Sequence, residues 1–358
     1  LNSITISFRI SLFCSNFAYK INQTTLIMKS HLLYFFCFFL IISCTVNNKQ
    51  KCERDKTPSL KTCFIQGFPW NDREQNPINA HNGSILYHEG TYYWYGEAHT
   101  APSFLPFQIN CYSSKDLLNW NFENIVFPSL TDKAIFPQKT VILSHPIVIY
   151  NKETQKFVLW VKTIESNPKI CIALSTHPNQ RFQTANIIKN DKKETPFTLF
   201  LDHNDKAYYI SSLKSEIRLY PLTKDYLNIQ NQYHHLPSLF QGTISLFKNG
   251  LKYHLILSNN QKTAQLLSAD SIHGTWTTSG NPYTGPDAEK NFHAQLSFIL
   301  PVQGKSHAFI AIFDNKKDSI AEKATPYIWL PIIFNGESPI IPWYDTWDTT
   351  IFHENNIQ

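Results

Sequence analysis

The sequence contains a single methionine, no dense basic run and no cysteine pattern typical of a metal site. Its 32 Lys and Arg residues outnumber its 27 Asp and Glu residues by only five, and they are scattered over 358 residues. A nucleic-acid surface is therefore not expected. No cysteine pair has zinc-ligand spacing, and the adjacent His234 and His235 are expected on a surface loop. We expect neither a metal nor another cofactor.

The only methionine, Met28, lies well inside the chain. A short basic segment follows it, and then the apolar run 32–42, which is too short to cross a bilayer comfortably. This order is typical of a signal peptide. We expect residues 1–27 to be a mis-called upstream extension and residues 28–43 to be the signal peptide.

The apolar run leads into Ser43-Cys44, which resembles the cleavage site of bacterial lipoproteins. In that interpretation Cys44 carries the lipid and residues 44–64 form a polar tether, whereas the alternative is an ordinary signal peptide with an incidental cysteine. The segment predicts an exported bacterial protein on the outer membrane or cell surface, with the periplasm as the alternative. Membrane contact is expected only through the lipid.

Four cysteines remain in the expected mature chain: Cys52, Cys63, Cys111 and Cys171. An exported compartment permits disulfides, and Cys52–Cys63 is the easiest pair by spacing. The sequence alone leaves the pairing open.

Five similar β-hairpins recur along the chain, without a long amphipathic helix or a Pro/Gly-rich break between them. In the clearest one, strands 84–87 and 91–95 flank His88-Glu89-Gly90, where the glycine supplies the positive φ of a tight turn. The other hairpins are expected at 146–161, 198–211, 244–257 and 296–313, and a third strand usually follows. This repeat predicts an all-β, five-bladed β-propeller forming one domain over residues 65–358, with a β-sandwich as the alternative.

In a propeller, the innermost strands line a central channel, and their ends present residues to a funnel on one face. The beginnings of the five hairpins, rather than their turns, should therefore surround any active site. These segments are 79–83, 143–146, 195–198, 241–244 and 293–296.

Several motifs resemble glycoside hydrolase family 43, most of all its branch of exo-β-1,3-galactanases. They include Ile78-Asn79-Ala80-His81, Tyr92-Tyr93-Trp94-Tyr95-Gly96-Glu97, Asn110-Cys111-Tyr112-Ser113-Ser114, Phe298-Ile299-Leu300-Pro301-Val302-Gln303-Gly304 and Tyr327-Ile328-Trp329-Leu330-Pro331. The resemblance spans roughly residues 65–350. It implies a five-bladed propeller that handles a galactose-containing oligosaccharide or a plant-type polysaccharide, in particular β-galactan.

The resemblance also shows which catalytic groups are missing. Inverting glycoside hydrolysis needs a carboxylic acid to protonate the leaving oxygen and a base to activate water. The family's acid is a Glu at the start of the fourth blade, where this sequence has Gly242. No Asp or Glu lies between Tyr233 and Asn260, so a shifted alignment does not restore the acid.

Three further family positions are also replaced. Ser144 and His145 stand where the family has the Glu that tunes the acid and the Arg that follows it. Pro196 aligns with an Asp expected near the start of the third blade. Gln295, which in this branch assists the attacking water, is retained and is the expected base-like group.

Four residues are candidates for substrate binding. Glu97 is expected to bind a sugar hydroxyl, although it would also suit a structural role at a strand end. His81 and Asn79 lie in the same motif, and His81 could equally pack the funnel wall. Trp329 is either a sugar platform or a buried core residue.

Two functions follow. The first is a family 43-like glycoside hydrolase, inverting by family, with a remodelled or degenerate site. The second is a non-catalytic, surface-anchored carbohydrate-binding propeller, in effect a pseudoenzyme. A carboxylate supplied from another loop, such as Asp287 or Glu289, would favour the enzyme, and a structural lipoprotein without a sugar ligand is a third, less favoured reading. The sequence leaves catalytic activity open.

Overall fold

The computed structural model describes eight stretches of the chain: residues 60–100, 105–128, 141–189, 196–213, 216–237, 242–259, 262–314 and 327–352. All of them belong to one compact unit, residues 54–358. The expected upstream extension, signal peptide, Cys44 and most of the tether lie outside the described residues. Among the described residues, no helix is long and apolar enough to span a membrane.

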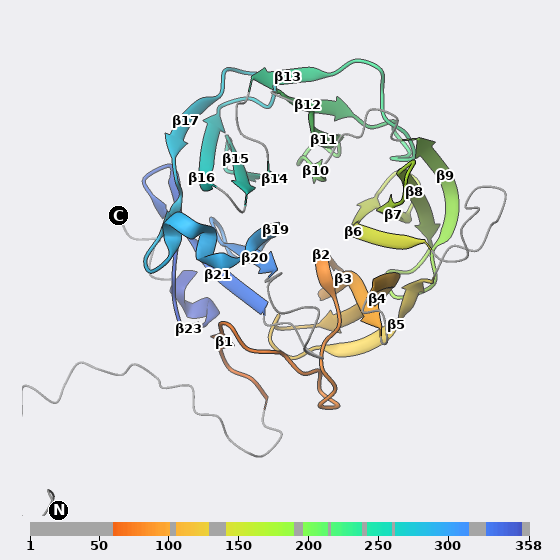
Figure 1. Cartoon of the computed structure of the whole chain (residues 1–358), viewed down its shortest axis with the longest axis horizontal. Coiled ribbons are helices and arrows are strands. Elements are labelled where there is room, and N and C mark those ends of the chain that lie inside the picture. Colours follow the sequence, from red (N-terminus) through yellow and green to blue (C-terminus); the bar gives the residue numbers. More distant parts are fainter. Residues whose placement is uncertain are drawn as a thin grey trace, which may run out of the picture. The chain divides into compact units, whose positions relative to one another are not determined.

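Five antiparallel sheets surround a central axis, and each is one blade of the predicted propeller (Figure 1). Within each blade the strands follow one another in sequence from the axis outward. Blade 1 comprises β2 (His81–His88), β3 (Thr91–Thr100), β4 (Leu105–Ser114) and β5 (Asn121–Phe127). Blade 2 comprises β6 (Ile142–Asn151), β7 (Lys156–Ile164), β8 (Lys169–Ser175) and β9 (Gln183–Lys189).

The other three blades repeat this plan. Blade 3 comprises β10 (Phe197–Leu201), β11 (Ala207–Leu213), β12 (Glu216–Pro221) and β13 (His234–Pro237). Blade 4 comprises β14 (Thr243–Asn249), β15 (Lys252–Asn259), β16 (Lys262–Ala269) and β17 (Thr277–Gly280). Blade 5 comprises β19 (Gln295–Pro301), β20 (Phe309–Asp314), β21 (Tyr327–Asn335) and β22 (Ser338–Pro342), with β18 (Tyr283–Thr284) parallel to β22.

All five predicted hairpins are therefore confirmed, and the prediction of a five-bladed propeller is correct. The first hairpin turns at Glu89 and Gly90, whose φ angles are 46° and 76°. A two-residue turn with two positive φ values matches the right-handed twist of the flanking strands, which explains the glycine.

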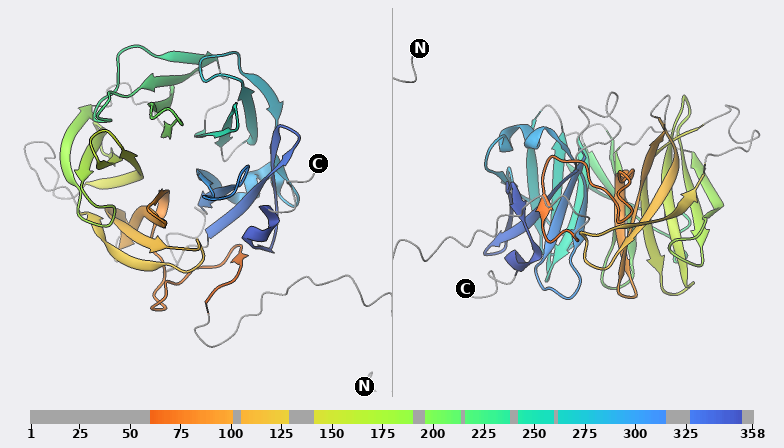
Figure 2. Two further views of the ribbon diagram at one scale, coloured as in Figure 1. Left: turned by 180° about the vertical axis from the view of Figure 1, so that it is seen from behind. Right: turned by 90° about the horizontal axis from the view of Figure 1, so that it is seen from below.

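Apolar side chains on both faces of each blade hold neighbouring blades together. On β7, Leu159 and Val161 face blade 1, whereas Val158 and Trp160 face blade 3. Five such hydrophobic clusters occupy the five boundaries between blades. Figure 2 shows the strands of every blade running between the two ends of the ring. The core is therefore distributed around the ring.

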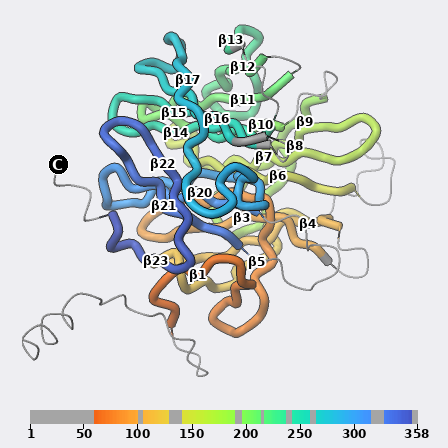
Figure 3. Tube along the Cα trace, turned by 60° about the vertical axis from the view of Figure 1, so that its left-hand side comes forward, coloured from red at the N-terminus to blue at the C-terminus, as the bar shows by residue number. Residues whose placement is uncertain are grey.

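The two ends of the described chain meet at the boundary between blades 5 and 1. The short strand β1 (Phe64–Ile65) pairs antiparallel with β23 (Thr346–Trp347), and Figure 3 shows the two side by side. Phe64 stacks on Trp347 with ring centroids 4.3 Å apart. Phe64 is wholly buried, so the expected tether ends before residue 64.

The cysteines divide into two kinds. Cys63 is disulfide-bonded, whereas Cys111 and Cys171 are buried free thiols. Cys52, the partner that spacing favours, lies outside the described residues.

Two short 3-10 helices, η2 (Ala288–His293) and η3 (Thr349–Phe352), complete the described structure. The η2 helix immediately precedes β19 and so leads into the innermost strand of blade 5.

Candidate functional site

The innermost strands β2, β6, β10, β14 and β19 surround the axis (Figure 1). Because every blade repeats the same strand order from the axis outward, all five begin at the same end of the ring. Near that end, each has a partner residue on the second strand of its blade. These pairs are His81 with Glu97, Ser144 with Lys162, Phe197 with Ser211, Thr243 with Ser258 and Gln295 with Asp314. The predicted placement of hairpin beginnings around one end of the channel is therefore observed.

Glu97 on β3 is the centre of a hydrogen-bond network that joins blades 1 and 2. One carboxylate oxygen accepts from Asn82 Nδ2 at 2.7 Å, Ser144 Oγ at 3.0 Å and the His145 backbone N–H at 2.8 Å. The other lies 3.3 Å from His99 Nε2. Burial alone would raise the Glu97 pKa, but hydrogen bonds from His99, the His145 backbone N–H and Asn82 lower it. Glu97 is therefore a carboxylate at neutral pH, suited to accepting hydrogen bonds rather than to donating a proton.

Two matching β-bulges create this geometry. The ladder between β2 and β3 is irregular just after His81, and the ladder between β6 and β7 is irregular just after Ser144. The residues that follow, Asn82 and His145, have left-handed φ angles of 47° and 57°. Bulges commonly re-aim side chains next to functional sites. Here they turn Asn82 and the His145 N–H toward the same carboxylate.

His81 lies beside this network and packs against the wall of the channel. Its ring stacks on Tyr327 at 5.5 Å and lies 4.7 Å from the His99 ring. Burial, reinforced by His99, lowers the His81 pKa to about 3, although Glu97 opposes this shift. The imidazole is therefore neutral at physiological pH and cannot serve there as a proton donor of imidazolium type.

The side chain of Asn79 already forms hydrogen bonds within the protein. Its Nδ2 donates to the His99 carbonyl at 2.9 Å, and its Oδ1 accepts from the His99 N–H at 2.8 Å. This pairing fixes the backbone next to Glu97. The side chain thus shapes the rim around the carboxylate through the backbone of its neighbour.

The prediction that Trp329 is a sugar platform is wrong. Its side chain is wholly buried and packs against Trp70 at 4.8 Å and Trp94 at 5.1 Å. A sugar ring needs an open aromatic face, and this tryptophan offers none. The alternative reading, a core residue, is correct because β21 is the third strand of its blade and lies away from the channel.

Comparisons with known proteins agree with this architecture. No protein-family profile and no curated protein sequence matches the chain. A solved family 43 β-1,3-galactosidase with bound galactodeoxynojirimycin matches at 29% identity and TM-score 0.72, covering 80% of this chain and 100% of that one. A second family 43 β-1,3-galactosidase matches at 26% identity and TM-score 0.73, covering 82% of this chain but only 65% of that one. The chain is a structural relative of glycoside hydrolase family 43.

The likeness extends to the expected branch of family 43. An exo-β-1,3-galactanase from Clostridium thermocellum matches at 26% identity and TM-score 0.69, covering 79% of this chain and 66% of that one. An exo-β-1,3-galactanase from Phanerochaete chrysosporium, solved with β-1,3-galactotriose, shares the fold at 24% identity and TM-score 0.72 over 82% of this chain and 70% of that one. This likeness supports a glycoside hydrolase-like protein that acts on carbohydrate.

The residues that the family 43 resemblance aligns with catalytic positions lie at the channel end of their blades. Gly242 and Pro196 immediately precede β14 and β10. Ser144 lies on β6 and donates its hydroxyl to Glu97, while His145 approaches Asn82 Oδ1 through Nδ1 at 3.3 Å. Ser144 and His145 thus both support the Glu97 carboxylate.

The two loop carboxylates that the sequence offered as alternatives, Asp287 and Glu289, form ion pairs with residues of their own loop. Asp287, which precedes η2, forms ion pairs with Lys290 at 3.1 Å and His293 at 3.4 Å. Glu289 pairs with the same lysine at 3.7 Å. These interactions all join residues of one short segment.

Sequence reasoning missed Asp314, the last residue of β20. It is 7% exposed and lies directly across the ladder from Gln295. Its place resembles that of Glu97, since each carboxylate lies opposite the first residue of an innermost strand. The signal was present in the sequence, because this aspartate directly follows the hairpin predicted over 296–313.

The arrangement supplies hydrogen-bond acceptors and a neutral imidazole near the channel. Of the ten residues in the five pairs, only Glu97 and Asp314 are carboxylates. Within the described part of the chain, no group of three or more His, Cys, Asp or Glu residues could hold a metal ion. Such a site is suited to binding sugar hydroxyls.

Proposed function

We propose that this chain is a family 43-like propeller that binds β-galactan at the channel end around Glu97 and hydrolyses it weakly or not at all. The observation that carries the proposal is the chemistry of the family's acid position. Gly242 has no proton to donate, and the network around Glu97 holds that carboxylate in its charged form.

The magnitude of the defect follows from the missing proton transfer. A positioned general acid contributes about 10²–10⁴-fold to the rate. The loss of the tuning carboxylate at Ser144 should reduce the rate further. Binding needs neither group, because a sugar hydroxyl can donate a hydrogen bond to the Glu97 carboxylate without any proton transfer.

The test compares binding and hydrolysis in the same protein. The chain from residue 45 onward is assayed for β-1,3-galactan binding and for galactose release. We expect binding without ready release, and a gain of release when Gly242→Glu and Ser144→Glu are combined. The control combines Ser144→Glu with Gly242→Gln, because glutamine matches the shape of glutamate but cannot act as a general acid. Ready release by the unmodified chain contradicts the proposal.

A second candidate, a working hydrolase with remodelled groups, is favoured by one observation. Asp314 faces Gln295 across the ladder, so a carboxylate lies beside the residue expected to assist water. If the unmodified chain releases galactose, Asp314→Asn should abolish that release while galactan binding persists. Unchanged release by Asp314→Asn contradicts this candidate.

We also propose that Cys44 anchors the protein to a bacterial outer membrane or cell surface. The support is the sequence of residues 28–44. In a bacterial host, the full chain should incorporate labelled fatty acid and sediment with membranes, and Cys44→Ser should abolish both. Retention of the label by Cys44→Ser contradicts the proposal.

A further inference from the structure

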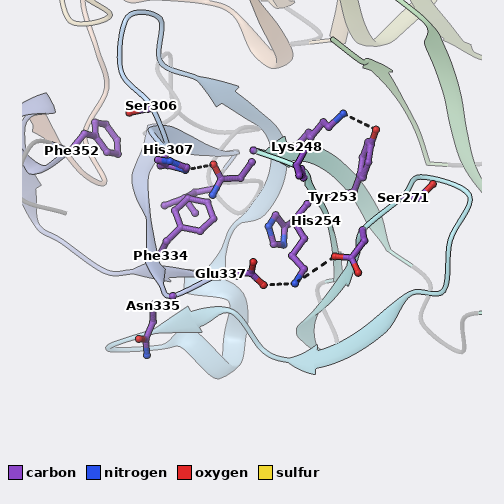
Figure 4. Close-up of a pocket in the computed structure, with 17 residues that line it drawn as sticks. Lys248, Tyr253, His254, Ser271, Ser306, His307, Phe334, Asn335, Glu337 and Phe352 are labelled. Atoms are coloured by element: carbon purple, nitrogen blue, oxygen red, sulfur yellow. Dashed lines mark hydrogen bonds and ion pairs between the residues drawn. The ribbon is translucent and has the colours of Figure 1, made fainter. Parts of the chain in front are cut away.

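A cavity of about 890 Å³ lies between blades 4 and 5 (Figure 4). It opens at the end of the ring opposite Glu97, because the turn that follows β14 lines it. Its walls come from turns and from the strand residues next to them, and not from the beginnings of the innermost strands. They include the turn between β14 and β15, the turn between β21 and β22, and Ser306 and His307 of the loop that precedes β20. The cavity therefore belongs to neither the channel end nor the family 43 site.

The charged groups around this cavity are already paired with each other or with their neighbours. Lys252 forms ion pairs with Glu337 and, at 3.6 Å, with Asp270. Lys248 lies 3.0 Å from Asp202 and donates to Tyr253 Oη at 2.8 Å. The two lysines and two carboxylates that line the cavity, Lys248, Lys252, Asp270 and Glu337, balance in charge, so the cavity suits a ligand without net charge.

The cavity also combines apolar and hydrogen-bonding surfaces. Phe334 and His254 lie in one wall with ring centroids 6.0 Å apart, and burial lowers the His254 pKa to about 4, so that ring is neutral. Leu251, 87% exposed, lies at the turn. Hydrogen-bonding groups come from Asn335 and from Asn249, whose Oδ1 lies 2.6 Å from His307 Nδ1.

We infer that this cavity is a second carbohydrate site, which takes a neutral oligosaccharide. A neutral sugar presents an apolar C–H face to aromatic and aliphatic side chains and hydroxyls to amides and carboxylates, and both kinds of surface are present here. Because the cavity and the Glu97 network lie at opposite ends of the blades, both sites can be occupied at once. A polysaccharide long enough to reach both ends of the ring would be held more tightly by the two sites than by either alone.

The experiment counts binding sites. The chain from residue 45 onward is titrated with β-1,3-galactotriose as the neutral probe. The unmodified chain should bind two molecules. Glu97→Gln should leave one site, and in that background Phe334→Leu or Asn335→Ala should weaken the remaining site about tenfold, the loss expected for one good aromatic or hydrogen-bond contact. The matched control is Phe122→Leu on the exposed outer strand β5, which should leave both sites intact.

The outcomes separate this inference from the proposed function. A single site that Glu97→Gln removes overturns the second site alone. A single site that Phe334→Leu weakens and Glu97→Gln leaves intact supports the second site and contradicts binding at the channel end. Absence of any binding overturns both. Tighter binding of a uronic acid-bearing oligosaccharide at the cavity overturns the assignment of a neutral ligand.

Discussion

Two neighbouring side chains, Glu97 and His81, show how local partners decide charge. Both are buried, and burial alone disfavours the charged form of each. Glu97 retains its charge because His99, the His145 backbone N–H and Asn82 all form hydrogen bonds with its carboxylate. Burial and the neighbouring His99 hold His81 neutral. The two residues are partners on one ladder, yet only Glu97 is equipped to hold a charge at neutral pH.

His81 predicts a pH dependence of stability. Its pKa is about 3 in the folded chain and about 6.5 when unfolded, so the unfolded chain binds an extra proton between these values. Stability should therefore fall as pH drops below 6.5, by about 2 kcal/mol at pH 5 from this residue. Urea unfolding at pH 7 and pH 5 measures the loss, which His81→Phe should reduce by that amount.

The control for His81 is an exposed histidine. His235→Phe on β13 should leave the difference between pH 7 and pH 5 unchanged. His254, whose pKa is lowered to about 4, contributes to the acid sensitivity in the same direction and remains present in both variants. An equal pH dependence in His81→Phe and the unmodified chain would refute this account of His81.

At the scale of the element, two glycines let the backbone at the start of β2 approach β3 unusually closely. A Cβ atom on Gly83 would lie 1.8 Å from the Tyr95 carbonyl oxygen, and one on Gly96 would lie 2.2 Å from the Ala80 carbonyl carbon. Backbone cannot yield to such contacts as a flexible side chain can. The glycines therefore permit the bulge that aims Asn82 at Glu97.

Gly96→Ala should destabilise the protein by about 3 kcal/mol or more, or prevent folding, because the new methyl group overlaps backbone. The free energy of unfolding, from urea titration, measures the effect. Gly274→Ala is the matched control, since its Cβ would meet its nearest neighbour, the Ser271 carbonyl oxygen, at 3.2 Å. Equal losses in the two variants would show that close approach of β2 and β3 is not the cause.

At the scale of the whole molecule, a ring of blades must be closed, and closure here joins the two ends of the described chain. The Trp329 backbone N–H donates to Gln66 Oε1 at 2.6 Å, and Trp347 Nε1 donates to the Trp329 backbone carbonyl at 2.7 Å. The backbone of Trp329 thus binds both the first and the last part of the described chain. Its family-like motif marks the scaffold and not a sugar platform.

Trp347→Ala should cost about 3–5 kcal/mol, because it removes a buried indole and leaves a cavity at the closure. Thermal unfolding should show one transition at a lower temperature, since every blade depends on the closed ring. Trp343→Ala, at a half-buried position in the same segment, should cost less. Separate transitions for different blades would contradict closure as the basis of cooperativity.

The alternation of short apolar strands and polar turns determined the five hairpins, because each strand must bury side chains against a neighbouring blade. The identities of Gly242, Ser144 and Pro196 likewise required no structure to show that carboxylates are absent there. Tertiary structure alone decided the rest. It buried Trp329, set Asp314 opposite Gln295, gathered four donors from two blades around Glu97, and formed the cavity between blades 4 and 5. Those outcomes depend on contacts between residues far apart in the chain, and such contacts leave no local period in the sequence.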